Sequence, residues 1–245
     1  MYKPLIVGNW KMHGSLDSIN TFFEEFKAPN NAQVVIMPPA IYLRDCISHK
    51  KGFWELGIQN VWTEYSGAYT GEISASMVGD FGVSWVLVGH SERRNYQNET
   101  DALIRQKVKC SIEVGMNVIL CVGETMQERS SGAAQEVIAN QLEIALNQGL
   151  SKEVSRIVVA YEPVWAIGTG NSATEIEAQE MHSFIRQTVV SVLGETAADL
   201  RILYGGSVKP DNAGLLLAQT DVNGLLVGGA SLQAGSFSDI IKARV

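Results

Sequence analysis

The chain has 245 residues, 46% of them hydrophobic and 18% charged, so it is long enough to bury a large core. Its net charge of −7 argues against broad binding to nucleic acid or to an anionic membrane, since both require clustered Lys and Arg. The absence of a long apolar run or a signal-peptide pattern, together with three cysteines that lack C-x-x-C spacing, predicts a cytoplasmic protein without nucleic-acid or membrane partners.

Short strand-like runs alternate with longer helix-like segments along the whole chain. The predicted strands are, in chain order, 4–10, 33–37, 55–60, 84–88, 117–122, 156–161, 201–204 and 223–227. Helical spacing of apolar residues is clearest at 16–27, 101–113, 135–147 and 175–193. Runs 86–88 and 157–160 lack polar alternation, which is typical of parallel strands buried on both faces. Periodicity alone leaves an open, doubly wound sheet possible.

The number of strand–helix units and the lack of a linker favour a closed barrel. Eight units in one undivided chain match the roughly 250 residues of a (β/α)8 barrel. We therefore predict an α/β fold, a single-domain (β/α)8 TIM barrel over residues 1–245. In either architecture, ligands bind at the carboxyl ends of the strands.

Five predicted strands end in polar or glycine-rich sequence. These ends are GNWK at 8–11, GHSERR at 89–94, YEP at 161–163, YGGS at 204–207 and VGGA at 227–230. Together with VWAIGTG at 164–170, they resemble the signature segments of the triosephosphate isomerase family, in the same order and from Gly8 to the final helix. The resemblance implies a cofactor-free interconversion of D-glyceraldehyde 3-phosphate and dihydroxyacetone phosphate through an enediolate, in glycolysis and gluconeogenesis.

Glu162 and His90 are the candidate base and electrophile. A carboxylate in a dry pocket can become more basic, although a lone glutamate at a strand end is more often solvated; the resemblance favours the base for Glu162. His90 precedes Ser91-Glu92, a helix-start pattern, so the nearby helix N-terminus should disfavour the imidazolium. The resemblance implies that His90 acts as a neutral electrophile.

Lys11 and Asn9 complete the predicted catalytic set. The ammonium of Lys11 would offset the charge of the enediolate and of the substrate phosphate. Asn9, two residues earlier on the same strand, would place an amide beside it. Both match the active-site pair of the resembled family. Glu92, just after His90, would be an acid near a helix N-terminus, and a capping or ion-pairing role would be enough to explain it.

Glycine pairs after the last two strands predict a phosphate site. Gly205-Gly206 precedes Ser207, and Gly228-Gly229 follows the eighth strand, where many barrels bind phosphate through backbone N–H groups. Glycine pairs by themselves are usually plain turns, so their position carries the prediction. The predicted substrate-binding residues are Asn9, Lys11, Gly168, Ser207, Gly228 and Gly229.

The segment after Glu162 is predicted to be a hinged lid. It consists of Pro163, Val164, Trp165, Ala166, Ile167, Gly168, Thr169 and Gly170. Closing it would expel water and keep the enediolate from eliminating its phosphate. By resemblance, Ile167 and Leu226 enclose the base. The resemblance also implies that Tyr161 holds the open lid through Trp165, and that Glu124 and Tyr204 hold it closed.

The loop at 65–73 is too long and too apolar to be idle surface. The resemblance implies that it docks on a second subunit of a homodimer, with Thr70 at its tip beside Asn9, Lys11 and Met12. His13 departs from the family, which usually has a small amide there. We expect Thr70, Met12 and His13 at the interface, where His13 could alter the strength or the pH dependence of the dimer.

Two alternatives are open to this sequence. Another phosphate-binding barrel, such as an aldolase or a sugar-phosphate epimerase, shares the glycine pattern but would need a Schiff-base lysine or metal ligands. A non-catalytic binding barrel would have lost Glu162, His90 or Lys11, and all three are present. We therefore expect an isomerase that takes a small phosphorylated three-carbon substrate and uses no metal and no organic cofactor.

Overall fold

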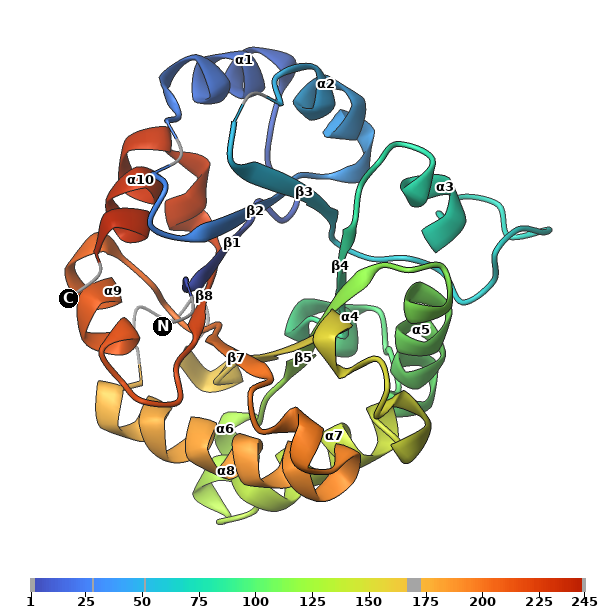
Figure 1. Ribbon diagram of the computed structural model, residues 1–245, viewed down its shortest axis with the longest axis vertical. Coiled ribbons are helices and arrows are strands. Elements are labelled where there is room, and N and C mark those ends of the chain that lie inside the picture. Colours follow the sequence, from blue (N-terminus) through green and yellow to red (C-terminus); the bar gives the residue numbers. More distant parts are fainter. Residues whose placement is uncertain (1–2, 28, 51, 167–172, 244–245) are drawn as a thin grey trace.

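The computed structural model describes residues 3–27, 29–50, 52–166 and 173–243. Its centre is a closed parallel barrel in which each strand pairs with the next and β8 pairs with β1 (Figure 1). The strands are β1 (Leu5–Asn9), β2 (Gln33–Met37), β3 (Trp54–Ile58), β4 (Trp85–Val88), β5 (Asn117–Val122), β6 (Ile157–Tyr161), β7 (Arg201–Tyr204) and β8 (Gly224–Val227). The predicted fold class is confirmed.

Helices surround the barrel (Figure 1). The α-helices are α1 (Leu16–Glu25), α2 (Leu43–Ser48), α3 (Ala75–Gly79), α4 (Ser91–Tyr96), α5 (Asp101–Glu113), α6 (Met126–Ser130), α7 (Ala134–Ala145), α8 (Glu175–Leu193), α9 (Pro210–Leu217) and α10 (Ala234–Lys242). Short 3-10 helices are η1 (Ala40–Tyr42), η2 (Gln148–Leu150), η3 (Val154–Arg156), η4 (Val164–Ala166), η5 (Glu195–Ala197) and η6 (Gly229–Leu232). In the described part of the chain, no helix is long and apolar enough to cross a membrane.

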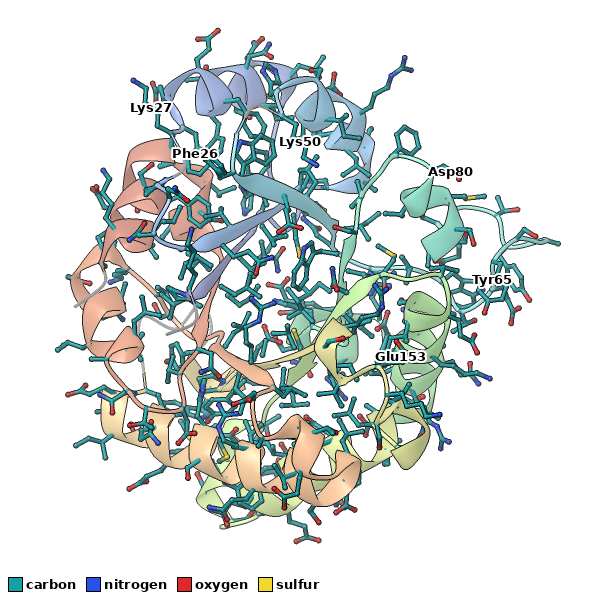
Figure 2. All side chains as sticks on the ribbon, in the orientation of Figure 1. Phe26, Lys27, Lys50, Tyr65, Asp80 and Glu153 are labelled. Carbon is teal, nitrogen blue, oxygen red and sulfur yellow. The ribbon has the colours of Figure 1, made fainter. Side chains whose placement is uncertain are left out.

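The strands bury both of their faces, as their unbroken apolar sequences predict. One face of every strand except β3 contributes to a compact inner cluster that includes Val7, Met37, Leu87 and Ala160. The opposite face packs under the helices in a larger cluster. Side chains fill the interior of the barrel (Figure 2). The barrel is therefore a packed core, and any ligand must bind at its rim.

The predicted boundaries differ from the observed ones by a few residues. Segments 101–113 and 175–193 coincide with α5 and α8, whereas 16–27 ends two residues late and 135–147 is shifted by one or two. Strand β1 ends at Asn9, so Trp10 and Lys11 lie in the connection that follows it. Helix-start signals explain the good agreement, because Thr100 and Thr174 cap α5 and α8 through their side chains.

Candidate active site

The turn after β1 positions Asn9 and Lys11. Asn9 is buried, and its Oδ1 accepts a 3.0 Å hydrogen bond from the backbone N–H of Lys11. Lys11 has a φ of 51°, a left-handed conformation that non-glycine residues rarely adopt. Gln59 supports this turn by donating 2.9 Å hydrogen bonds to the carbonyl oxygens of Lys11 and Met37. The Lys11 ammonium lies 2.6 Å from Glu92 Oε1.

His90 is the N-cap residue of α4. Its Nδ1 accepts a 3.2 Å hydrogen bond from the backbone N–H of Glu92. Because Nδ1 is an acceptor, the neutral ring carries its proton on Nε2, which faces Glu162 Oε1 at 2.9 Å. The prediction that a helix begins directly after His90 is confirmed.

Glu162 follows β6 and is 2% exposed. Its Oε2 accepts a 2.9 Å hydrogen bond from the backbone N–H of Ser91, and its Oε1 contacts His90. Gly205 makes room for this side chain, because a Cβ there would stand 3.0 Å from Glu162 Cγ and 3.5 Å from Leu226 Cδ2. Leu226 therefore lies close to Glu162, as the resemblance implied.

The contact between Glu162 and His90 sets the pKa of both groups. Burial opposes ionisation of Glu162, but His90 and the Ser91 N–H outweigh it and hold the pKa of this carboxyl below its usual value. Burial lowers the pKa of His90, and the Glu162 carboxylate outweighs that effect and raises it. Burial thus acts on Glu162 in the expected direction, but in this arrangement the net shift of its pKa is the opposite of the one expected. Both shifts depend on a contact that a turn of Glu162 would break.

A cavity of about 230 Å³ opens beside these groups. It is lined by Asn9, Lys11, Met12, Gln59, Leu87, His90, Glu92, Arg93, Tyr96 and Gln97. Its volume suits a ligand smaller than a drug-sized molecule. A larger cavity of about 370 Å³, between α6, α7 and α8, is lined by none of the predicted catalytic residues. We assign the site to the smaller cavity because three of the four predicted catalytic side chains meet there.

One of the glycines predicted to bind phosphate, Gly228, lies close to Lys11. A Cβ at Gly228 would stand 3.4 Å from Lys11 Cε, so the lysine side chain passes over the loop after β8. Gly229 begins η6. Ser207 is half-buried in the loop after β7, and its carbonyl oxygen accepts a 3.0 Å hydrogen bond from Asn212. The loops are neighbours because β7 pairs with β8.

Hydrogen bonds join the predicted lid and the residue Ala173 beyond it to the barrel. Trp165 Nε1 donates to Glu124 Oε1 at 2.8 Å, and the Tyr161 hydroxyl donates to the same oxygen at 3.0 Å. Beyond the lid, the N–H of Ala173 donates to the Tyr204 hydroxyl at 3.2 Å. Glu124 thus contacts Trp165, and Tyr204 contacts Ala173; that these two residues hold a closed lid stays a prediction. The lid residues Ile167, Gly168, Thr169 and Gly170 lie outside the described residues.

The residues predicted at a subunit interface are exposed in the single chain. They are Met12, at 94% exposed, His13 and Thr70. Thr70 belongs to the loop between β3 and α3, which projects from the barrel in Figure 1 and carries Tyr65, labelled in Figure 2. A 2.8 Å hydrogen bond from the Trp62 N–H to the Ile73 carbonyl closes the base of this loop.

Gln59 and the backbone N–H of Ser91 contact predicted catalytic residues but were not predicted themselves. Gln59 directly follows β3, so the strand-end rule that identified His90 and Glu162 could also have identified it. Ser91 contributes its backbone N–H, which no side-chain pattern reveals. Among the residues that the structure describes, no group of three or more His, Cys, Asp or Glu could hold a metal ion. The expectation of a reaction without cofactors stays a prediction.

Comparison with known proteins gives one consistent match. The sequence model described as triosephosphate isomerase matches residues 4–244. A relative called triosephosphate isomerase from Cupriavidus necator is 46% identical over 247 residues, covering 99% of this chain and all of the relative. Proteins of the same name from Pelobacter propionicus and Moorella thermoacetica are each 44% identical, over 250 and 246 residues, and cover at least 99% of both chains.

Proposed function

The chain belongs to the triosephosphate isomerase family, and we propose that Glu162, His90 and Lys11 carry out its reaction. That reaction interconverts D-glyceraldehyde 3-phosphate and dihydroxyacetone phosphate, a step of glycolysis and gluconeogenesis, so the protein is an aldose–ketose isomerase. The family assignment removes the aldolase and epimerase alternatives. The observation that supports the residue assignment best is the 2.9 Å contact between His90 and Glu162, beside a cavity that Lys11 also lines.

Glu162 is the base in this proposal. It removes a proton from the carbon beside the carbonyl; the C–H electron pair becomes the C=C bond of an enediolate, and the carbonyl oxygen takes the negative charge. The protonated carboxyl then gives its proton to the neighbouring carbon. Because Glu162 contacts His90 and Ser91 and does not line the cavity, it must turn toward the substrate first. That turn breaks the contacts that lower its pKa, so the carboxylate becomes more basic where it acts.

His90 and Lys11 stabilise the enediolate. His90 donates from Nε2 to the substrate oxygens and helps to move a proton between them. Once Glu162 turns away, burial and the charge of Lys11 both lower the pKa of His90, so the ring works in its neutral form. The Lys11 ammonium offsets the negative charge on the oxygens and on the phosphate, and the Asn9 amide fixes the turn that presents it.

The phosphate binds in the loops after β7 and β8. Backbone N–H groups at Gly228 and Gly229 and the Ser207 hydroxyl supply donors, and Gly168 adds an N–H from the lid. The closeness of Gly228 to the Lys11 side chain supports this site. Closure of the lid, residues 163–170, excludes water from the enediolate.

The active form is a homodimer in the cytoplasm. Large apolar side chains exposed on the single chain support the dimer, and many of them follow β1, β3 and β4; these include Met12, Tyr65, Tyr69, Met77, Phe81 and Tyr96. Light scattering should give twice the mass of the 26.7 kDa chain. A monomer at micromolar concentration that retained full activity would contradict this proposal.

The decisive experiment is turnover of glyceraldehyde 3-phosphate in the presence of a chelator, with wild type beside Glu162→Gln. The change keeps the size of the side chain but removes the base, so turnover should be lost while the fold is retained. Glu136→Gln is the matched control, since Glu136 is exposed on α7. Activity in Glu162→Gln close to that of the control would remove Glu162 as the base.

A further inference from the structure

Gln141 is a polar residue beside the buried stripe of α7. The helix buries Ile138, Leu142 and Ala145, and Gln141 lies three residues after Ile138, on the same side of the helix. The Gln141 side chain is half-buried. An amide that turns toward the barrel needs hydrogen-bond partners there, because burying an unpaired amide is unfavourable. Gln141 therefore has to bind a polar group of the barrel.

Both ends of the Gln141 amide bind the backbone of one residue, Gly123. The Gly123 N–H donates to Gln141 Oε1 at 2.9 Å, and Gln141 Nε2 donates to the Gly123 carbonyl oxygen at 3.1 Å. Gly123 directly follows β5, whereas β4 ends at Val88, which pairs with Leu120. Because β4 stops short of Gly123, Gln141 supplies the two hydrogen bonds that a longer neighbouring strand would give.

Gly123 lies against the backbone of Glu162. A Cβ at Gly123 would collide with the Glu162 carbonyl oxygen and stand 2.8 Å from the carbonyl carbon. The N–H of Glu162 donates a 2.8 Å hydrogen bond to the carbonyl oxygen of Val122. On the other side, Gly205 donates its N–H to the Tyr161 carbonyl oxygen at 2.7 Å, and a Cβ there would stand 3.0 Å from Glu162 Cγ. The residues that follow β5 and β7 therefore hold Glu162 between them.

The position of the Glu162 Cα decides where its carboxylate can reach. In the structure the carboxylate contacts His90, and it has to turn about its side-chain bonds to reach the cavity. Such a turn leaves the backbone in place, so its end point depends on the Cα. A displacement of about one ångström can cost a catalytic group on the order of 10²-fold in rate. Whatever fixes Gly123 therefore also fixes the reach of the base.

We propose that Gln141 is a positioning residue for proton transfer: its side-chain amide holds the backbone of Gly123, and Gly123 holds the Cα from which the Glu162 carboxylate turns toward the substrate. This inference rests on the proposed function of Glu162. Gln141 is not one of the described residues that line the cavity, so its loss should lower kcat and leave KM nearly unchanged.

Proton removal should become slower, relative to the other steps, when the base is displaced. In glyceraldehyde 3-phosphate the proton that Glu162 removes is bound to C2, and this C–H bond breaks as the carboxylate takes the proton. Deuterium at C2 should therefore give a larger isotope effect on kcat in a variant with a displaced base than in wild type. A change that merely lowers the amount of folded protein alters neither the isotope effect nor KM. The isotope effect thus separates positioning from stability.

The test compares Gln141→Met with the matched control Gln135→Met. Methionine has nearly the length of glutamine but lacks the amide, so both hydrogen bonds to Gly123 are lost. Gln135 is exposed in the first turn of the same helix, so the same substitution there tests the helix alone. Gln141→Met should lower kcat roughly 10-fold and raise the isotope effect, while KM stays within about 2-fold. The control should match wild type in all three quantities.

Wild-type kcat and isotope effect in a folded Gln141→Met would overturn the inference, even if its melting temperature fell. Should this variant fail to fold, Gln141→Glu keeps the acceptor for the Gly123 N–H and loses only the donor to the Gly123 carbonyl oxygen. A smaller fall in kcat with a raised isotope effect is then expected, and unchanged values there would overturn the inference too.

Glu162→Gln, measured in parallel, separates this inference from the proposed function. If Glu162→Gln stays active, Glu162 is not the base, and the positioning role of Gln141 is wrong with it. If Glu162→Gln is inactive while Gln141→Met matches wild type, the base is supported and only the role of Gln141 is wrong.

Discussion

The two ends of the barrel pair their polar side chains in different ways. At the amino end, Glu55 accepts hydrogen bonds from Gln33 Nε2 at 2.7 Å and Trp85 Nε1 at 2.9 Å. Arg201 donates to Gln33 Oε1 at 2.6 Å and lies 5.7 Å from the centre of the Trp85 ring. Four strands thus contribute to one network whose carboxylate oxygens are both hydrogen-bonded. Such a network holds the strands together through hydrogen bonds that satisfy both oxygens of its carboxylate.

The carboxyl end contains a strained backbone conformation and a carboxylate that is incompletely hydrogen-bonded. Lys11 has a positive φ, Glu124 has an unpartnered carboxylate oxygen among the described residues, and Glu162 and His90 shift the pKa of each other. Strained or poorly satisfied groups persist only when the surrounding structure holds them, and they cluster at functional sites. The comparison therefore assigns stability to the amino end and chemistry to the carboxyl end.

The largest expected effect is at Glu162. Glu162→Asp should fold with nearly unchanged stability but lose on the order of 10²-fold or more in kcat, because the shorter side chain withdraws the carboxylate by about an ångström. Steady-state kinetics beside thermal unfolding would measure both quantities. Turnover close to wild type would place Glu162 among the structural residues and break the contrast between the two ends.

Lys11 should give the next largest effect. Lys11→Met removes the ammonium but keeps much of the apolar chain that passes over Gly228, so the rate should fall by on the order of 10²-fold, about the effect of one oxyanion donor. Kinetics at several substrate concentrations would show the loss in kcat/KM. A variant that lost only dimer stability, measured by light scattering, would assign Lys11 a structural role.

Much of this division can be read from the sequence, because a strand end is marked by a change in polarity. The apolar runs before His90 and Glu162 located both residues correctly, and the helix-start pattern after His90 was confirmed. The resemblance supplied the roles of these residues, which spacing alone left open. Lys11 was placed at the end of a strand, but it lies in a left-handed turn that periodicity does not reveal.

Contacts between distant segments could not be predicted from the sequence. The contact of Glu162 with His90, together with the hydrogen bond from the Ser91 N–H, reverses the expected pKa shift, and both groups lie far away in the chain. The amino-end network is similar, since Arg201 and Gln33 are 168 residues apart and neither lies in a recognisable motif. Such pairs appear only when barrel closure brings the strands together.

Glu55 tests the amino end directly. Glu55→Leu leaves the donors of Gln33 and Trp85 unpaired and removes the carboxylate that favours the charged form of Arg201, so stability should fall by about 1–3 kcal/mol. The denaturant midpoint should shift, whereas kcat at 25 °C should stay within about 2-fold, because the site lies at the other end. A large loss of kcat in a folded variant would show that the two ends are coupled.

The smallest effect is expected at His182, which lies near the carboxyl end but should affect stability alone. Its ring is 5.9 Å from that of Tyr161 and 6.4 Å from that of Tyr204, and burial lowers its pKa to about 4. An unfolded histidine titrates near pH 6.5, so between these values the unfolded state binds a proton that the folded state does not. Folding stability therefore falls as the pH drops below about 6.5, and the loss is complete near pH 4.

His182→Gln removes this proton linkage while an amide N–H can still reach the carbonyl oxygen of Asp221, which lies 3.2 Å from His182 Nδ1. Between pH 7 and pH 5.5, wild type should lose about 1 kcal/mol more stability than the variant, as measured by denaturant unfolding at each pH. A difference between the two proteins that did not change with pH would contradict the buried neutral ring. If kcat at pH 7 also fell, His182 would belong with the site, because the tyrosines beside it bind Glu124, which accepts from Trp165, and Ala173.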